Sequence, residues 1–455
     1  MPKSQALSTE TDGALNLLDD LIARAKSRGA DAADAVLVNG VSKSVTQRLG
    51  ERERLERAEG NDLGLRVLIG RRQAVASSND WKNDSLDEVV DRAIAMAQTV
   101  PEDPYCGLAA PDEVFVGPLR DPDICDPEEP TVESLTARAK ACEDAARAVE
   151  GITNSEGAEA SWSLSSVALL ASNGFAGSYA MSNHGIGVAV LAGEGTAMER
   201  DYEFSSTVFL ADLEDAEVIG RRAAARAVRR LGARKVSTAK VPVVYDPRVA
   251  NSLVRHLAAA ANGVAVARGT SFLKNRMGER VFADGIAMVD DPHRERGLRS
   301  KPFDAEGMAN PKMALVEDGV LRNWVLDLRT ARQLGLQTTG RAARGTSSPP
   351  APATTNVYLE PGRLSPAALI GEIESGLYVT ELIGMGVNMV TGDYSRGAAG
   401  FWIENGEIAY PVSEITVAGN LKDMFANLAP ADDLEFRYGT NAPTVRVDGM
   451  TVAGA

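Results

Sequence analysis

Residues 390–421, VTGDYSRGAAGFWIENGEIAYPVSEITVAGNL, carry the clearest sequence signals for the fold of the C-terminal half. Its glycines give the backbone freedom ahead of the apolar run FWI at 401–403. The pair Asn405-Gly406 is the strongest short signal for a β-hairpin. Beyond that pair, apolar side chains alternate with small or polar ones, as in a half-buried strand. The stretch therefore predicts a glycine-rich loop followed by a β-hairpin.

The same glycine-rich loop carries side chains of the kinds that bind ligands. Asp393, Tyr394, Ser395 and Arg396 place an acid, a phenol, a hydroxyl and a guanidinium between glycines. Irregular glycine-rich loops are where binding groups usually lie. The alternative is a tight connection in which Asp393 and Ser395 only satisfy nearby backbone donors. Both interpretations stay open on the sequence.

The pattern of apolar residues changes along the chain and predicts four regions. An N-terminal α/β domain covers residues 1–100, a Pro- and Asp-rich connection covers 101–130, a central α/β region covers 131–235, and a β-rich domain covers 241–455. The last domain opens with one helix, for which Asp246 is the predicted N-cap and Pro247 the first residue. The expected fold class is therefore mixed, α+β with α/β parts.

Composition and charge exclude some classes of function. The chain has 455 residues, of which 44% are hydrophobic, and a formal net charge of −15. This acidic excess argues against DNA, RNA or an anionic membrane as the main partner, because phosphate binding depends on excess Lys and Arg. The first residues lack the apolar core of a signal peptide, and no run approaches the roughly 18 apolar residues of a spanning helix. We therefore expect a cytoplasmic protein.

A cluster of basic residues begins within a helix predicted at about 215–231 and continues just beyond its end. The cluster consists of Arg221, Arg222, Arg226, Arg229, Arg230, Arg234 and Lys235. Such a cluster suits a polyanion, but acidic residues precede it, and the helix dipole favours that order of charges. A solvated or subunit-facing surface is the preferred interpretation.

The three cysteines indicate a reducing compartment. Cys106, Cys125 and Cys142 form neither a CxxC pair nor a disulfide framework, and their number is odd. Cys142 falls on the apolar stripe of a helix predicted from residue 131, which makes it a core residue.

Three segments of the sequence resemble those of one protein family. They are SSNDW at 77–81, SSPPAPATTNVYLEPG at 347–362 and the hairpin segment at 390–421. The sequences of these segments are similar to those of the TldD/PmbA family of bacterial peptidase-related proteins. Within that family they are most similar to the PmbA branch, also called TldE. The resemblance is weak over residues 1–230 and clear over 241–452.

The other branch of that family, TldD, carries a zinc-binding HExxxH motif on a helix, which matches the helix predicted here at 247–262. On that helix Arg255 stands at the first histidine position, His256 at the glutamate position and Ala260 at the second histidine position. A protonated arginine cannot ligate zinc, alanine has no donor atom, and no glutamate remains as general base. The late cysteine ligand of that branch is also missing, since the last cysteine is Cys142. We expect no metal ligand and no catalytic residue in this chain.

The resemblance implies a cytoplasmic heterodimer of one TldD-like and one PmbA-like subunit. It implies trimming or degradation of unstructured peptides, with microcin maturation and a link to DNA gyrase inhibition in some members. Only the zinc-bearing subunit would cut, so zinc is expected in the partner, and residues 393–396 would lie near the peptide cleft. Two alternatives stay open: a homodimeric peptide-binding adaptor, and an independent hydrolase with an unrecognised site, such as His256 with an acid brought close by folding.

Overall fold

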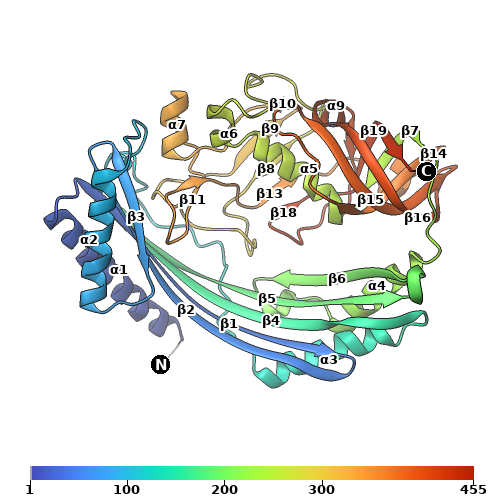
Figure 1. The fold of residues 1–455 in the computed structure, drawn as a ribbon, viewed down its shortest axis with the longest axis horizontal. Coiled ribbons are helices and arrows are strands. Elements are labelled where there is room, and N and C mark those ends of the chain that lie inside the picture. Colours follow the sequence, from blue (N-terminus) through green and yellow to red (C-terminus); the bar gives the residue numbers. More distant parts are fainter. Residues whose placement is uncertain (1–2, 455) are drawn as a thin grey trace.

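The computed structural model describes residues 3–454. The N-terminal half is built on one six-stranded sheet of long strands. The sheet is curved, and the C-terminal half lies against its concave side (Figure 1). Its elements are α1 (Lys3–Ser27), β1 (Ala32–Arg48), β2 (Glu51–Ile69), β3 (Arg72–Ser78), α2 (Asn83–Thr99), α3 (Val132–Arg147), β4 (Ile152–Ala171), β5 (Ala176–Ala192), β6 (Glu199–Thr207) and α4 (Ala216–Arg229). No helix within the described residues is long and apolar enough to cross a membrane.

The long sheet is antiparallel throughout, with the strand order β3-β2-β1-β4-β5-β6. Strand β1 returns into β2 through Leu49 and Gly50, both at positive φ, and strands joined by so short a turn must run antiparallel. The predicted α/β packing, which is built on parallel strands, is therefore wrong, and the protein is α+β. Strand β1 also pairs with β4, so segments on both sides of the connection at 101–130 share one sheet. The four-region division of the chain stays a prediction.

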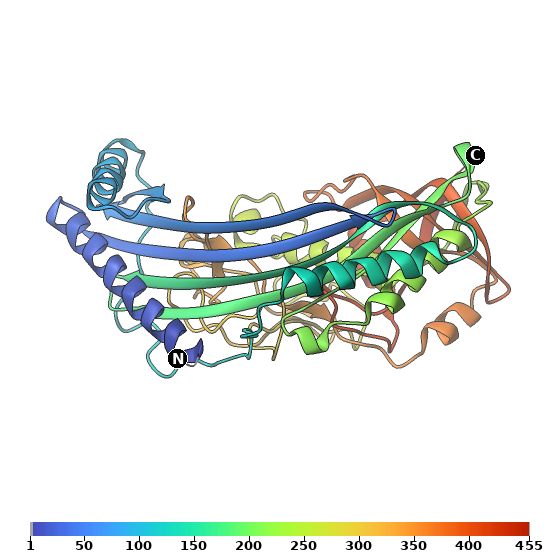
Figure 2. The ribbon, with the colours of Figure 1, turned by 90° about the horizontal axis from the view of Figure 1, so that it is seen from below.

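One face of the long sheet is covered by the four helices. Side chains alternate along β1, and Ala33, Leu37 and Val45 point to the helix side. Helices α1 and α2 cover one end of this face, and α3 and α4 cover the other (Figure 2). Cys142 of α3 is fully buried there, which confirms its predicted place in the core. Burial raises the pKa of its thiol to about 12.

The opposite face of the long sheet meets the C-terminal half. Val36 of β1 and Leu169 of β4 pack with Phe303 and Met308 in one buried cluster. The alternation of a strand thus places one set of side chains on the helices and the other on the C-terminal half. The sheet is covered on both faces at this end.

A buried polar contact also joins the two halves. Asp34 of β1 forms ion pairs with Arg66 of β2 and with Arg344, and all three side chains are almost fully buried. The loop that follows Arg344 packs closely on β2, since a Cβ on Gly64 would lie 2.1 Å from the carbonyl oxygen of Thr346. The proline-rich segment is therefore held against the sheet.

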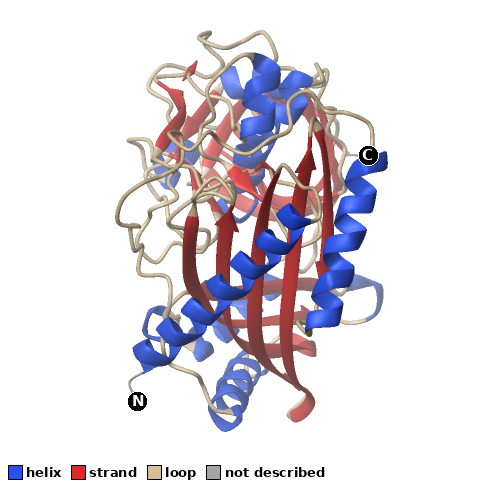
Figure 3. Cartoon of the chain, turned by 90° about the vertical axis from the view of Figure 1, so that its left-hand side faces the viewer, coloured by secondary structure: helices blue, strands red, loops and turns tan. Residues whose placement is uncertain are grey.

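The C-terminal half contains a small barrel and a second sheet. Its elements are β7 (Ala239–Tyr245), α5 (Pro247–Ala260), α6 (Gly263–Ala267), β8 (Met288–Asp290), β9 (Met313–Glu317), β10 (Val320–Leu321), α7 (Leu328–Leu334), β11 (Ala342–Ala343), β12 (Ala351–Pro352), β13 (Val357–Leu359), α8 (Pro366–Gly371), β14 (Ser375–Ile383), β15 (Asp393–Glu404), β16 (Glu407–Asn420), α9 (Leu421–Ala426), β17 (Leu428–Pro430), β18 (Thr440–Asn441) and β19 (Val445–Ala453). Strands β16, β15, β14, β7 and β19 are neighbours in that order, and the pairing of β16 with β19 closes them into a five-stranded barrel. Strands β10, β9, β8, β13 and β18 form the second sheet, and loops make up much of the rest (Figure 3).

The C-terminal half confirms the hairpin and the β-rich character that the sequence predicts. Strands β15 and β16 are antiparallel, and Asn405 and Gly406 join them with φ angles of 51° and 78°. Positive φ at both turn residues is the geometry that Asn-Gly favours.

The basic cluster of α4 is engaged in contacts within the chain. Arg222 and Arg226 both pair with Glu203 of β6, which is buried, and the guanidinium of Arg229 lies 4.4 Å from the ring centre of Phe401. Arg222 and Arg226 are half-buried, whereas Arg221 and Arg229 are exposed. A subunit-facing role for this surface stays a prediction. Phe401 belongs to β15, which is distant from α4 in the sequence, so the helix alone could not reveal this contact.

Candidate functional site

Helix α5 begins where the sequence predicts. Asp246 caps it by accepting a hydrogen bond from the backbone N–H of Arg248 (2.9 Å), and Pro247 is its first residue. Leu253 and Leu257 are buried in the main core of the C-terminal half. Because a helix repeats every 3.6 residues, the polar positions of α5 emerge on another side, toward β6 and the barrel.

The three degenerate motif positions have different surroundings. Ala260 is fully buried in the core, Arg255 is exposed, and His256 is half-buried. The ring of His256 meets the ring of Tyr394 edge-on, with the centroids 6.1 Å apart. Burial, followed by the charges of Arg396 and Arg255, lowers the pKa of His256 to about 4. His256 is therefore a neutral imidazole at physiological pH.

Residues 393–396 are not an irregular loop, as the sequence predicts, but the start of β15. They pair with residues 417–420 of β16, and this long-range pairing overrides the local glycine signal. Tyr394 is buried and Arg396 half-buried, whereas Asp393 and Ser395 are exposed on the other side of the strand. The four candidates are thus divided by the strand, and only Tyr394 and Arg396 lie with the residues of α5.

A cavity of about 240 Å³ lies between β6, α5 and strands β14 and β15. Five arginines line this cavity, which we call the arginine pocket. They come from β6, α5, β15 and the end of α4: Arg200, Arg230, Arg248, Arg255 and Arg396. Two acids, Asp201 and Glu381, line it as well. Five positive charges less two negative ones leave a surplus of three positive charges on the lining residues.

Three of the five arginines are committed to acids. They are Arg230 with Glu381 (2.6 Å), Arg248 with Asp201 (2.7 Å) and Arg200 with Glu156 (2.7 Å). Among the side chains that the structure describes, those of residues 13–454, no carboxylate pairs with Arg255, and Arg396 bonds only to the carbonyl of Leu382 (3.3 Å). The buried Nε of Arg396 has no hydrogen-bond partner among the described residues. The positive surplus therefore sits on Arg255 and Arg396.

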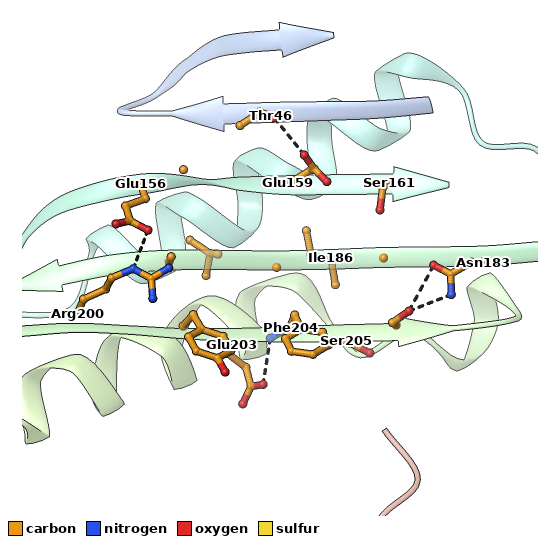
Figure 4. Close-up of a pocket in the computed structure, with 17 residues that line it drawn as sticks. Thr46, Glu156, Glu159, Ser161, Asn183, Ile186, Arg200, Glu203, Phe204 and Ser205 are labelled. Carbon is orange, nitrogen blue, oxygen red and sulfur yellow. Dashed lines mark hydrogen bonds and ion pairs between the residues drawn. The ribbon is translucent and has the colours of Figure 1, made fainter. Parts of the chain in front are cut away.

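A larger groove of about 560 Å³ runs over the long sheet on the face turned away from the helices (Figure 4). Small residues keep it open: a Cβ on Gly185 would lie 2.6 Å from Oγ of Ser161, and one on Gly187 would lie 3.0 Å from Cβ of Phe204. We call this the sheet groove. It shares Arg200 and Tyr202 with the arginine pocket, so the two hollows meet at β6.

Strand β6 is the edge of the long sheet, but its backbone groups are occupied around the groove. The N–H groups of Tyr202 and Phe204 donate to the carboxylates of Asp201 (2.7 Å) and Glu203 (3.0 Å). The carbonyl of Phe204 accepts a hydrogen bond from Arg437 (2.9 Å). Groups satisfied in this way are not available to an added strand. A ligand in the groove would therefore have to be bound by side chains.

Sequence reasoning placed Arg255 and Arg396 at a candidate site and named Arg230 as part of the basic cluster, but it missed the other pocket residues. Arg200, Arg248 and Thr380 line the pocket from three separate elements, and no spacing rule joins them. The sequence does show that Arg248 lies in the first turn of a capped helix. The capping pattern explains the helix start, however, and gives no sign that Arg248 lines a pocket.

Three domains of one family match the chain in order. The PmbA/TldA metallopeptidase domain 1 matches residues 33–97, the central domain matches 125–231, and the C-terminal domain matches 238–454. The chain is 34% identical to metalloprotease PmbA of Escherichia coli over the whole of both proteins. It is 36% identical to the PmbA homolog of Haemophilus influenzae over 94% of each. The chain therefore belongs to the PmbA/TldD metallopeptidase family.

Solved structures share the whole fold. A putative modulator of DNA gyrase from Bacteroides thetaiotaomicron superposes with a TM-score of 0.90 at 27% identity, over 97% of this chain and 98% of the other. TldE from Thermococcus kodakarensis superposes with a TM-score of 0.86 at 21% identity, over 96% and 100%. At that identity the second likeness shows the fold alone.

The residues at the motif position do not fit a metal ion. Arg255 and Arg396 are cations beside His256, and Ala260 has no donor atom and is buried. No group of three or more His, Cys, Asp or Glu side chains arranged to hold a metal occurs in the described part of the chain. The lone imidazole of His256 is also short of the three protein ligands that a catalytic zinc uses.

Proposed function

We propose that this chain is the PmbA-like, non-catalytic subunit of a cytoplasmic zinc metallopeptidase that acts on unstructured peptides. Its partner is a TldD-like subunit that carries the HExxxH motif and the zinc, in a heterodimer. The observation that carries this proposal is the chemistry of α5, where cationic Arg255 and buried Ala260 replace the two zinc-binding histidines.

The role proposed for the chain is to bind peptide. The sheet groove is long and open, and the aromatic rings of Tyr202 and Phe204 stack with centroids 6.3 Å apart along it. Aromatic faces and small residues accept many side chains, which suits substrates without a fixed sequence. The occupied edge of β6 makes side-chain contacts, rather than strand addition, the proposed means of holding the peptide.

The proposal is tested by the metal content and the partner of the purified chain. Elemental mass spectrometry after desalting is expected to find far less than one zinc per chain. Co-expression with an HExxxH relative from the same genome is expected to give a stable complex that co-purifies and contains zinc. Stoichiometric zinc in the isolated chain would refute the assignment of α5, and failure to co-purify would favour the homodimeric adaptor.

A further inference from the structure

The arginine pocket contains polar groups for which the chain itself supplies no partner. Thr380 is only 9% exposed, and its Oγ1 makes no hydrogen bond with any described part of the chain. The buried Nε of Arg396 is also unpartnered. Buried polar groups are normally satisfied, so a set of them around one cavity indicates a polar ligand. The cavity of about 240 Å³ far exceeds the roughly 10–15 Å³ that a single water needs.

The charges of the pocket indicate that this ligand is an anion. Arg230, Arg248 and Arg200 already have acids, but Arg255 and Arg396 do not. The pKa of Arg255 is lowered, first by partial burial and then by the charge of Arg396, so the two cations repel each other. An anion placed between them would relieve this repulsion and satisfy both guanidinium groups.

The planar fork of a guanidinium matches a carboxylate, which it binds through two parallel hydrogen bonds. The pocket also adjoins the sheet groove, since Arg200 and Tyr202 line both hollows. A chain lying in the groove would therefore pass beside the pocket. We propose that the arginine pocket binds a carboxylate of the peptide in the groove, with Arg255 and Arg396 as its cationic ligands and Thr380 as a hydroxyl donor. This inference rests on the proposed function, because it requires peptide in the groove.

The test measures binding of short peptides to the full-length chain by fluorescence anisotropy. The peptides contain glycine, serine and alanine and carry a neutral fluorophore at the N-terminus. One has a free C-terminal carboxylate, a second is amidated, and a third is amidated but contains an internal Glu. The free-acid or the Glu peptide is expected to bind at least about tenfold more tightly than the plain amide. Tighter binding of the free-acid peptide would show that the pocket binds a C-terminal carboxylate. Tighter binding of the Glu peptide would show that it binds an acidic side chain.

Arg396→Gln and Arg255→Gln are the informative variants. Neither residue has an acidic partner, so neither change leaves a buried carboxylate unpaired, in contrast to Arg248, which pairs with Asp201. Each variant is expected to abolish the preference for the carboxylate, so that the free-acid and Glu peptides bind no more tightly than the plain amide. Arg221→Gln is the matched control, since Arg221 is exposed on α4 and pairs with Glu217. It is expected to behave as wild type.

The outcomes separate this inference from the proposed function. Equal binding of all three peptides would overturn the carboxylate site and leave peptide binding intact. A preference that survives both arginine variants would also overturn it. If no peptide binds, thermal stabilisation by a small carboxylate, N-acetylglycine, is measured against its amide. Stabilisation lost in Arg396→Gln would keep the anion site and refute the peptide role, and no stabilisation would refute both.

Discussion

The environment of His256 predicts a specific loss of stability in acid. Its folded pKa is about 4, against 6.5 for the ordinary side chain, because burial and the charges of Arg396 and Arg255 oppose protonation. Between these two values the unfolded chain binds a proton that the folded chain does not, so stability rises with pH across this window and falls as pH drops through it. The loss is fully present once the pH is below about 4.

The magnitude follows from the two pKa values. Between pH 7 and pH 5 the linkage relation gives a loss of about 2 kcal/mol in the free energy of unfolding from this one group. The assay is urea unfolding at both pH values for wild type and for His256→Gln. Wild type is expected to lose about 2 kcal/mol more than the variant, which has nothing to protonate at this site.

Arg396→Gln serves as the intermediate case in this series. It removes the second-largest cause of the shift and leaves burial, which is the largest. The pH dependence is therefore expected to shrink without vanishing. If wild type and His256→Gln lose the same free energy between pH 7 and pH 5, His256 is not held neutral by its surroundings, and the reasoning about the two unpaired arginines fails with it.

Three further predictions concern the framework around the site. Arg341→Met breaks an ion pair in which both side chains are fully buried and should lower the free energy of unfolding in urea by about 3–5 kcal/mol; a loss near that of Arg276→Met, a half-exposed position, would contradict this. Cys142, whose thiol pKa is raised to about 12, should not react with iodoacetamide at pH 8 until urea unfolds the chain, and native labelling would show that α3 opens. Gly64→Ala places a Cβ where the carbonyl of Thr346 lies 2.1 Å away, so limited proteolysis should cut the loop at 345–350 faster than in wild type, and an unchanged rate would refute the close packing.

The sequence predicts those parts of the fold whose causes are local. The hairpin follows from Asn405-Gly406, and the start of α5 follows from Asp246 and Pro247. In each case the residues that determine the structure are neighbours in the chain, so the pattern alone is sufficient. Cys142 is placed correctly for the same reason, since its helical stripe is local.

The rest depends on pairing between distant segments. Strand β1 pairs with β4, which lies more than a hundred residues later. The sequence of neither strand identifies the other as its pairing partner. Residues 393–396 have the glycines of a loop but become a strand because β16 pairs with them. The arginine pocket is equally non-local: Arg200, Arg248 and Arg396 come together only after the sheet, α5 and the barrel are assembled.

We propose above that this chain supports peptide cleavage by a zinc-bearing partner without performing the cleavage itself. The most direct measurement is hydrolysis of an unstructured peptide by the isolated chain, by a zinc-bearing HExxxH relative alone, and by the two mixed in equal amounts. The account predicts negligible turnover by the isolated chain and strong turnover by the mixture, lost on chelation of zinc. Full turnover by the isolated, partner-free chain would contradict it.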